Sequence, residues 1–244
     1  MMDRVARSSD EPSLTVIVPL AGPDFERPDG TVKADLRVDG KPLLDATLQA
    51  RPWWGDNVVL VFVLRDTRIS RAFAEDRLLI DYPNARIAWL SHQTSGAAWS
   101  CALGLSLAVR ADSPVIVDLC DIVFETQVDI GALMVADRRL GGLAMTFDAD
   151  DAHYSYLKLA PDGRVEVACE KSVISRHASA GVYVFRDAAT FFEAFAYSLR
   201  HRETLSFQGA LYVCPMLNGV VASGRDVRCV AVDNVHDIKI AALA

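Results

Sequence analysis

Residues 14–20 read LTVIVPL, and residues 21–44 continue AGPDFERPDGTVKADLRVDGKPLL. The first run is short, apolar and rich in β-branched residues, which is typical of a strand buried on both faces of a parallel sheet. The chain then enters a charged loop that contains glycine, and a helix is expected only near Pro42. In α/β proteins such a loop binds phosphates through backbone amides and a few cations, here Lys33 and Arg27. Taken alone, a single lysine in a loop is more often a solvated surface residue.

Four further apolar runs in the first 150 residues have the same character. They lie at residues 58–64, 85–90, 114–119 and 140–147. Helical patterns fall between the runs, at residues 41–51, 68–82 and 96–109. This alternation predicts an α/β fold with a mostly parallel, doubly wound central sheet flanked by helices. Ligands of such sheets bind at the carboxyl ends of the strands.

Beyond residue 150 the pattern changes to alternating apolar and polar residues separated by turn signals. The alternating runs lie at residues 154–159, 165–170 and 180–185. Pro161-Asp162-Gly163 separates the first two runs and predicts a β-hairpin. A helix near residues 188–200 and a strand near 227–232 follow. Without a flexible linker or an internal repeat, we expect a disordered lead-in at residues 1–13 and one domain over 14–244 with a small antiparallel annex.

The 244-residue chain carries 25 basic and 32 acidic side chains, which gives a net charge of −7. This balance argues against a nucleic-acid partner, because binding to a phosphate backbone requires clustered lysine and arginine, but it leaves room for a small phosphorylated ligand. The five cysteines are odd in number and widely spaced, as expected of reduced thiols. The sequence contains neither the apolar stretch of a signal peptide nor a run long enough to span a membrane. We therefore expect a cytoplasmic protein without a membrane partner.

Short motifs surround the first expected strand and the loop after it. They are Pro19, Ala21 and Gly22 at the strand end, Gly40-Lys41-Pro42-Leu43 at the helix opening, and Lys33 seven residues before Gly40. With these motifs the sequence resembles the sugar-phosphate nucleotidyltransferases, or NDP-sugar pyrophosphorylases, especially their short bacterial capsule and surface-polysaccharide members. The resemblance implies a Rossmann-like fold of the glycosyltransferase A type. It also implies that Lys33 and Arg27 are catalytic and that Ala21 and Gly22 contact the nucleotide.

Two further motifs follow strands of the expected parallel sheet. Residues 93–98 (QTSGAA) are similar to the family's base-recognition segment, which implies that Gln93, Gly96 and Ala97 contact the nucleotide. Without the family, the same residues are a helix N-terminus with a Thr or Ser cap. Residues 115–121 (VIVDLCD) resemble the strand that leads to the family's magnesium-binding aspartate, here Asp121. An aspartate in this place otherwise caps a helix or forms a turn.

The second half of the chain contains motifs similar to the family's acceptor site. Glu170-Lys171 and the later Ala180-Gly181-Val182-Tyr183 resemble a glutamate that accepts sugar hydroxyls and a lysine and a glycine that approach the sugar phosphate. Read alone, Glu170 and Lys171 are an exposed hairpin pair and Gly181 is a simple strand glycine. The resemblance covers residues 14–240, with a nucleotide half over residues 14–150 and an acceptor half over residues 151–240.

The sequence departs from the family pattern in two places. In the loop after the first strand, which is three residues shorter than the family loop, Pro23 removes an amide donor. In the same loop Asp24 and Glu26 put negative charge where the triphosphate is expected. Near the C-terminus, residues 233–238 (DNVHDI) replace a family segment that supplies a second metal or phosphate contact, and Asp233 is the candidate for this role.

Three functions are compatible with these residues. The leading one is a Mg²⁺-dependent nucleotidyltransferase for surface-polysaccharide precursors, which joins a nucleoside monophosphate from a nucleoside triphosphate to a sugar 1-phosphate, or a similar small phosphate or phosphonate, and releases pyrophosphate. The sequence also allows a homodimer. The second is a catalytically weakened homologue that binds a nucleotide or nucleotide-sugar as a regulatory or partner protein. The third is a glycosyltransferase that binds a metal through Asp148-Ala149-Asp150.

Overall fold

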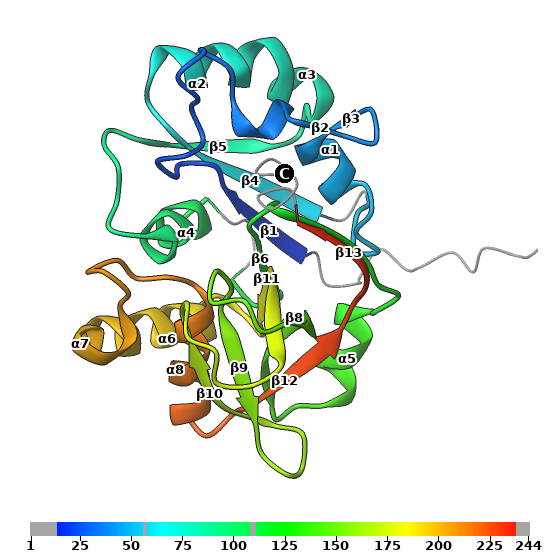
Figure 1. Ribbon diagram of the computed structural model, residues 1–244, viewed down its shortest axis with the longest axis vertical. Coiled ribbons are helices and arrows are strands. Elements are labelled where there is room, and N and C mark those ends of the chain that lie inside the picture. Colours follow the sequence, from blue (N-terminus) through cyan, green and yellow to red (C-terminus); the bar gives the residue numbers. More distant parts are fainter. Residues whose placement is uncertain (1–13, 56–57, 108–110, 238–244) are drawn as a thin grey trace, which may run out of the picture.

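The computed structural model describes residues 14–55, 58–107 and 111–237, and the expected lead-in at residues 1–13 lies outside them. The main sheet within the described residues contains β1 (Leu14–Pro19), β4 (Val58–Arg65), β5 (Arg86–Leu90), β6 (Val115–Asp118), β8 (Leu140–Asp148), β9 (Tyr156–Leu159), β10 (Val165–Cys169), β11 (His177–Phe185) and β12 (Asp226–Ala231). Its main path runs β10-β9-β11-β6-β1-β4-β5 (Figure 1). The two remaining strands extend from β11, because β8 pairs with β11 and β12 pairs with β8.

The first half of the sheet is parallel, as the alternating sequence predicts. β1 pairs in parallel with β4 and β6, and β4 pairs in parallel with β5. β11 is antiparallel to both β6 and β8, so β8 runs in the same direction as β6 but is separated from it by one strand. The predicted α/β class, with a mostly parallel sheet and an antiparallel annex, is confirmed. Because β1 and β6 are adjacent and parallel, the loops after them meet at one edge of the sheet.

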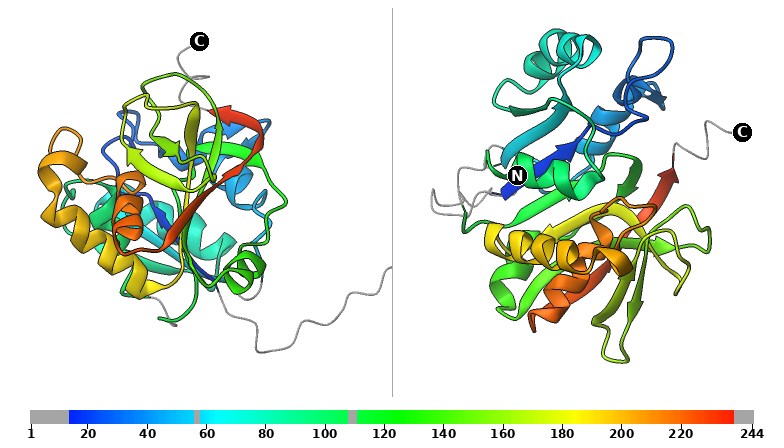
Figure 2. Two further views of the ribbon diagram at one scale, coloured as in Figure 1. Left: turned by 90° about the horizontal axis from the view of Figure 1, so that it is seen from below. Right: turned by 90° about the vertical axis from the view of Figure 1, so that its left-hand side faces the viewer.

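Helices cover both faces of the sheet, as the two views in Figure 2 show. They are α1 (Leu43–Leu48), α2 (Arg68–Phe73), α3 (Leu79–Asp81), α4 (Ala97–Leu105), α5 (Ile130–Ala136), α6 (Ala188–Arg200), α7 (Arg202–Leu205) and α8 (Leu217–Ala222). Val16 and Val18 of β1 belong to one hydrophobic core, with Leu44 of α1 and Phe73 of α2. Ile17 belongs to a second core, with residues of α4, α6 and α8. Burial on both faces explains why the run at residues 14–20 is apolar without alternation.

Two predicted helices differ from the observed ones. The helix expected over residues 41–51 begins only at Leu43, because Lys41–Pro42 forms β3 and pairs with β2 (Arg37–Val38). Pro42 has an extended backbone, with ψ at 143°, and so precedes the helix instead of continuing it. The helix expected over residues 68–82 is interrupted between α2 and α3 by a π-helical segment at Ala74–Leu78.

Pairing between distant segments accounts for a small second sheet that the sequence does not predict. β7 (Ile122–Glu125), which follows β6 closely, pairs in antiparallel fashion with β13 (Asp233–Asp237) near the C-terminus. This pair brings the segment at residues 233–237 beside the loop after β6. The hairpin expected at Pro161-Asp162-Gly163 is confirmed, since β9 and β10 are antiparallel and Gly163 has a φ of +82°.

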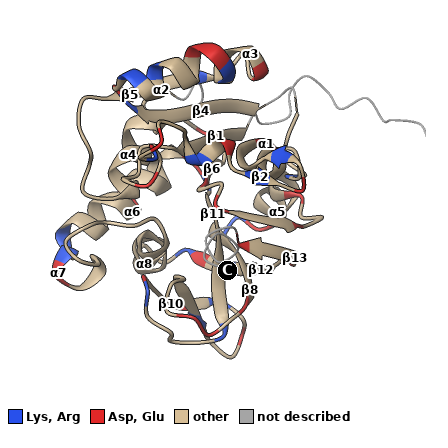
Figure 3. Cartoon of the chain, turned by 45° about the horizontal axis from the view of Figure 1, so that its top comes forward, with Lys and Arg blue, Asp and Glu red and all other residues tan. Residues whose placement is uncertain are grey.

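The surface of the described residues carries charges of both signs. Figure 3 shows lysine and arginine interspersed with aspartate and glutamate over most of the elements. No helix in the described ranges is both long and apolar enough to cross a membrane.

Candidate active site at the edge of the sheet

Lys33 and Asp121, 88 residues apart in the sequence, are in contact at the carboxyl edge of the parallel strands. The Nζ atom of Lys33 lies 2.5 Å from Oδ1 of Asp121 and 2.9 Å from Oδ2 of Asp24. The three side chains come from the loop after β1, a short 3₁₀ helix (Lys33–Asp35) and the loop after β6. A hollow beside them is lined by Leu20, Phe25, Lys33, Ala34, Leu43, Leu44, Leu119, Cys120 and Asp121. The structure therefore brings together two residues that the motifs single out separately.

The backbone around Phe25 places Lys33 at this position. Phe25 is buried against Phe73 of α2, with ring centroids 5.7 Å apart, and its carbonyl accepts a 2.7 Å hydrogen bond from the amide of Lys33. Burial lowers the pKa of Lys33, but the carboxylates of Asp121 and Asp24 outweigh this effect and hold the pKa above its ordinary value. The Lys33 side chain is therefore a positively charged ammonium at neutral pH.

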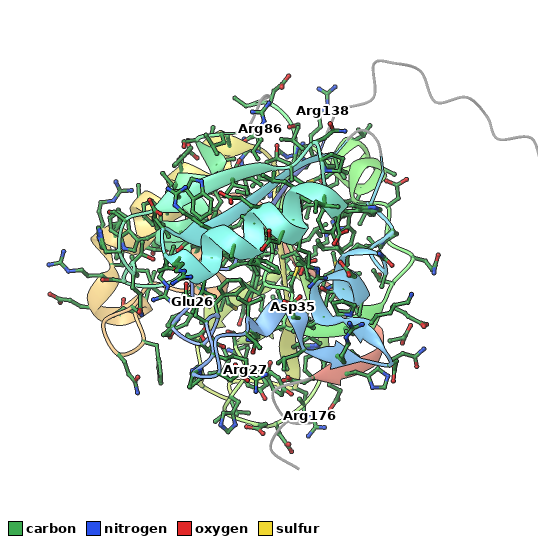
Figure 4. The ribbon with its side chains drawn as sticks, turned by 90° about the horizontal axis from the view of Figure 1, so that it is seen from above. Glu26, Arg27, Asp35, Arg86, Arg138 and Arg176 are labelled. Carbon is green, nitrogen blue, oxygen red and sulfur yellow. The ribbon has the colours of Figure 1, made fainter. Side chains whose placement is uncertain are left out.

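The two acidic residues of the loop after β1 have different surroundings. Glu26 accepts hydrogen bonds from the hydroxyls of Thr67 and Ser70 at the start of α2, and its other oxygen lies 3.0 Å from the guanidinium of Arg65. Burial raises the pKa of Glu26, but these hydroxyls and Arg65 outweigh it and keep the pKa below its ordinary value. Figure 4 labels Glu26 close to the helix that follows β4. Of these two acids, Asp24 is therefore the one whose carboxylate contacts Lys33.

Arg27, the second predicted catalytic cation, lies apart from the Lys33 contact. Arg27 opens an exposed turn (Figure 4). The amide of Arg27 donates to the carbonyl of Thr31, and the carbonyl of Arg27 accepts the amide of Gly30. Within the described residues, no hydrogen bond or ion pair joins the Arg27 side chain to Lys33 or Asp121.

A buried ion pair fixes the loop that carries Asp121. Arg51 donates to Asp118 at 2.8 Å, and both side chains are only 1% exposed. The same guanidinium donates to the carbonyl of Ile122 and lies 3.7 Å from the ring centroid of Phe124. Asp118 also accepts the amide of Cys120, which has a φ of +51°. Arg51 thus contacts both ends of the loop at residues 119–121.

The motifs do not single out either member of this pair. Asp118 was part of an apolar strand pattern, and a charged residue inside such a run indicates that a buried partner of opposite charge exists somewhere in the fold. The sequence does not show which of the 25 basic residues is that partner.

The candidate metal ligands Asp121 and Asp233 lie at different ends of the β7–β13 pair. Asp233 is opposite Glu125. Glu125 comes four residues after Asp121, which is about 13 Å along an extended strand. Asp237 is opposite Ile122, the residue directly after Asp121. The sequence motif already contained Asp237, and only the register shows that its backbone lies nearer to Asp121 than that of Asp233 does.

The Asp121 carboxylate, which lines the hollow, fits magnesium in one specific mode. The described residues contain no group of three or more His, Cys, Asp or Glu side chains that could hold a metal ion. Magnesium, however, is usually bound through one or two carboxylates together with substrate phosphates and water. Asp121, whose side chain is 22% exposed, meets this requirement, and Asp237 is the second candidate.

The predicted base-recognition segment follows β5 and is closed from one side by a distant loop. Gly96 has a φ of +112°, and a Cβ at this position would lie 2.1 Å from the carbonyl oxygen of Leu211. Leu211 donates to the carbonyl of Ser95 and accepts the amide of Ala98. Gly96 is therefore required for the approach of Leu211, whatever else it contacts. Gln93 is exposed, and Ala97 is the first residue of α4.

The loop after β1 begins with two residues of the predicted nucleotide site. Ala21 is buried, whereas Gly22 is half-buried and accepts the amide of Phe25 in a turn. An ideal Cβ on Gly22 would lie 2.8 Å from Oδ1 of Asp24. The Asp24 carboxylate therefore lies against the main chain at Gly22.

The predicted acceptor residues come from two strands of the annex: Glu170 and Lys171 follow β10, and Gly181 lies in β11, the neighbour of β6. Gly181 has a φ of +77°, and its carbonyl accepts the amide of Leu119, in the loop before Asp121. Glu170 follows β10 and accepts a 2.5 Å hydrogen bond from Ser155. The ammonium of Lys171 is exposed and lies 5.4 and 5.9 Å from the ring centroids of Phe207 and Tyr212.

Asp148 and Asp150 match the Asp-any-Asp pattern of a glycosyltransferase metal motif, and both carboxylates form ion pairs with one arginine. Arg176 forms ion pairs with Asp148 and, at 3.2 Å, with Asp150. All three side chains are well exposed. This pairing does not favour the glycosyltransferase hypothesis.

The fold is similar to those of solved nucleotidyltransferases and pyrophosphorylases. A nucleoside-diphosphate-sugar pyrophosphorylase from Vibrio cholerae is similar with a TM-score of 0.75 and 20% identity, over 91% of this chain and 94% of that chain. The inositol-1-phosphate CTP transferase of T. maritima is similar with a TM-score of 0.64 and 13% identity, over 93% and 88% of the two chains. A UDP-glucose pyrophosphorylase complexed with UDP-glucose is similar with a TM-score of 0.65 and 13% identity, over 90% of this chain and 90% of that chain.

No family model matches the chain, and no curated protein matches it in sequence. At identities of 13 to 20%, the structural similarity establishes the fold. The Rossmann-like nucleotidyltransferase fold implied by the sequence motifs is confirmed at this level.

Proposed function

We propose that this protein is a magnesium-dependent nucleotidyltransferase. It joins a nucleoside monophosphate from a nucleoside triphosphate to a sugar 1-phosphate, or a similar small phosphate or phosphonate, and releases pyrophosphate. The contact between Lys33 and Asp121 carries the proposal, because it puts an ammonium and a carboxylate side by side at the ligand-binding edge of a nucleotidyltransferase fold. The proposed setting is the cytoplasmic synthesis of surface-polysaccharide precursors, which the likeness to short capsule-type members implies.

In the proposed reaction, an ionised phosphate oxygen of the acceptor attacks the α-phosphorus of the nucleotide. A bond forms between this oxygen and the α-phosphorus, the bond from the α-phosphorus to the bridging oxygen breaks, and its electron pair leaves with pyrophosphate. No general base is required, since the attacking oxygen is already ionised. Lys33 stabilises the negative charge that develops on the α-phosphate oxygens.

The other predicted site residues have positioning roles in this proposal. Ala21, Gly22, Gln93, Gly96 and Ala97 hold the nucleotide, Glu170, Lys171 and Gly181 hold the acceptor, and Arg27 contacts the phosphates once substrate is bound. Asp121 and Asp237 hold magnesium, with Asp233 as the sequence-based alternative to Asp237. When bound, the metal neutralises charge on the phosphate oxygens. The homodimer stays a prediction that light scattering after gel filtration can test.

A second candidate function is a homologue that binds a nucleotide or nucleotide-sugar without turnover. The observation that favours it is the 2.9 Å contact between Asp24 and Lys33, which puts a carboxylate on the proposed catalytic ammonium. Both functions require ligand binding at the same edge of the sheet. They differ in whether pyrophosphate is released.

Pyrophosphate release separates the two functions. We would measure it with magnesium over a panel of nucleoside triphosphates and sugar 1-phosphates, for the native protein and for Lys33→Ala. The transferase proposal predicts at least one productive pair, with a rate that falls at least about a hundredfold in Lys33→Ala. If no pair gives release that depends on Lys33 while nucleotides still raise the melting temperature, the binding function is supported instead.

A further inference from the structure

One positive and two negative side-chain charges meet at the proposed phosphate site. Lys33 contacts both Asp24 and Asp121, at 2.9 and 2.5 Å. The charge of Glu26, the other acid of the loop, is offset locally by Arg65. The Lys33 ammonium is therefore already in contact with two carboxylates. A metal-free polyphosphate that approaches Lys33 is repelled by the negative charge of these two groups.

Asp24 differs from Asp121 in how firmly it is held. Its side chain is 61% exposed, whereas that of Asp121 is 22% exposed and belongs to the loop fixed by Arg51. The Asp24 carboxylate lies against the Cα atom of Gly22, because a Cβ there would be 2.8 Å from its Oδ1. The missing side chain at residue 22 thus leaves room for the carboxylate beside Lys33, and solvent on its other side leaves it room to swing away.

We infer that Asp24 is a specificity-determining residue of the phosphate loop, whose carboxylate takes the place of an anionic phosphate oxygen on Lys33. A polyphosphate then binds only by displacing Asp24 from the ammonium. The site consequently discriminates against metal-free polyphosphates and accepts those whose charge is reduced by a bound divalent cation. This inference rests on the proposed function, because it takes Lys33 as the group that contacts substrate phosphate.

The loop offers a matched control for the charge of Asp24. Asp29 lies in the same loop, is exposed, and accepts hydrogen bonds from the amide and hydroxyl of Thr31 instead of contacting Lys33. Asp24→Asn and Asp29→Asn remove the same charge from the same loop. Any difference between them therefore reports the contact with Lys33 and not the net charge of the protein.

The test is the affinity of the full chain for inorganic pyrophosphate, measured by titration calorimetry with EDTA present. We expect Asp24→Asn to bind about tenfold more tightly than the native protein. We expect Asp29→Asn to change the affinity by no more than about twofold, because its charge is screened by solvent. In a Lys33→Met background, Asp24→Asn should have at most about a twofold effect, since the competed cation is missing.

Three results overturn the inference. They are equal changes for Asp24→Asn and Asp29→Asn, a gain from Asp24→Asn that persists without Lys33, and the absence of pyrophosphate binding in all variants. Failure of the proposed function has a different signature. If Asp24→Asn tightens binding through Lys33 but no substrate pair releases pyrophosphate, the anion site stands and the transferase proposal fails. If the native protein is active and both variants have the same KM for the triphosphate, only the inference about Asp24 fails.

Discussion

The loop after β1 and the loop after β6 meet at the contact between Lys33 and Asp121, yet they are held in place differently. The loop over residues 20–32 is long, contains several exposed side chains, and contacts Lys33 through an exposed aspartate. The loop over residues 119–121 has only three residues, and an ion pair that is 1% exposed on each side lies beneath it. One side of the proposed site is adjustable, and the other side is fixed.

This difference suggests a division of work between the two loops. A rigid support increases the affinity of a carboxylate for a metal, because the side chain is already ordered by folding before the metal binds. A cation that must exchange a carboxylate for a substrate phosphate gains from exposure, since the exchange requires movement of a side chain. The predictions below break one loop at a time, starting with the largest expected effect.

Breaking the buried ion pair beneath the fixed loop should lower the stability of the protein more than any other change proposed here. Asp118→Asn leaves the guanidinium of Arg51 buried without a counter-charge, and we expect the free energy of unfolding to fall by about 3 kcal/mol. For a chain of this size this corresponds to a drop in melting temperature of roughly 6–12 °C. Chemical denaturation followed by circular dichroism measures the change.

The exposed loop supplies the control. Asp29→Asn, in the loop after β1, should leave the midpoint of chemical denaturation close to that of the native protein, because the side chain is exposed. Combining Asp118→Asn with Arg51→Met should cost less than the sum of the single changes, because the double variant buries no unpaired charge. Additive losses would show that Arg51 and Asp118 act independently, contrary to the proposed fixed loop.

The register of β13 allows the metal proposal to be sharpened. If Asp237 assists Asp121, Asp237→Asn should raise the magnesium concentration for half-maximal pyrophosphate release at least about tenfold. Asp233→Asn is the matched change at the other end of the same strand. It should alter this magnesium concentration by less than about threefold, because the backbone of Asp233 lies opposite Glu125, at the end of β7 away from Asp121. A larger effect at Asp233 than at Asp237 would favour the sequence-based assignment. Magnesium titrations of the two variants decide between them.

The smallest expected effect concerns Glu26, the acid of the adjustable loop that is tied to α2. Its pKa is lowered in the folded protein, so its carboxylate contributes stability above the unfolded pKa of about 4.3 and loses it as the pH falls through the lower folded pKa. Between pH 6 and 3, the melting temperature should therefore fall less steeply in Glu26→Gln than in the native protein. Glu193→Gln, at an exposed position of α6, should follow the native curve. Identical curves for all three proteins would show that Glu26 is not tied to α2.

The sequence predicts the parallel sheet and its edge because those features depend on local patterns. Burial on both faces produces the apolar runs, and the turn residues at 161–163 produce the hairpin. The contact between Lys33 and Asp121 follows from the order of parallel strands, which the motifs suggest but do not fix. The pairing of β7 with β13 depends on residues more than 100 positions apart, so local patterns cannot predict it.

Two site features are beyond single-sequence reasoning for a physical reason. Arg51 becomes the partner of Asp118 only through tertiary packing, and nothing in its local sequence distinguishes it from the other basic residues. The fates of Asp24 and Glu26 differ because the loop turns between Gly22 and Phe25, where the amide of Phe25 donates to the carbonyl of Gly22, so one side chain reaches Lys33 and the other reaches Arg65 and α2. The sequence identifies two acids in the phosphate loop, and only the fold separates their roles.

The rate of pyrophosphate release by native protein and by Lys33→Ala, with magnesium and the best substrate pair, tests the central claim most directly. We predict a loss of at least about a hundredfold in Lys33→Ala, because the ammonium that contacts Asp121 is removed from the transferring phosphate. The variant should keep its fold and melt within a few degrees of the native protein, which thermal denaturation checks. A native protein that releases pyrophosphate at a rate unchanged by Lys33→Ala would contradict the claim that Lys33 and Asp121 form the active site.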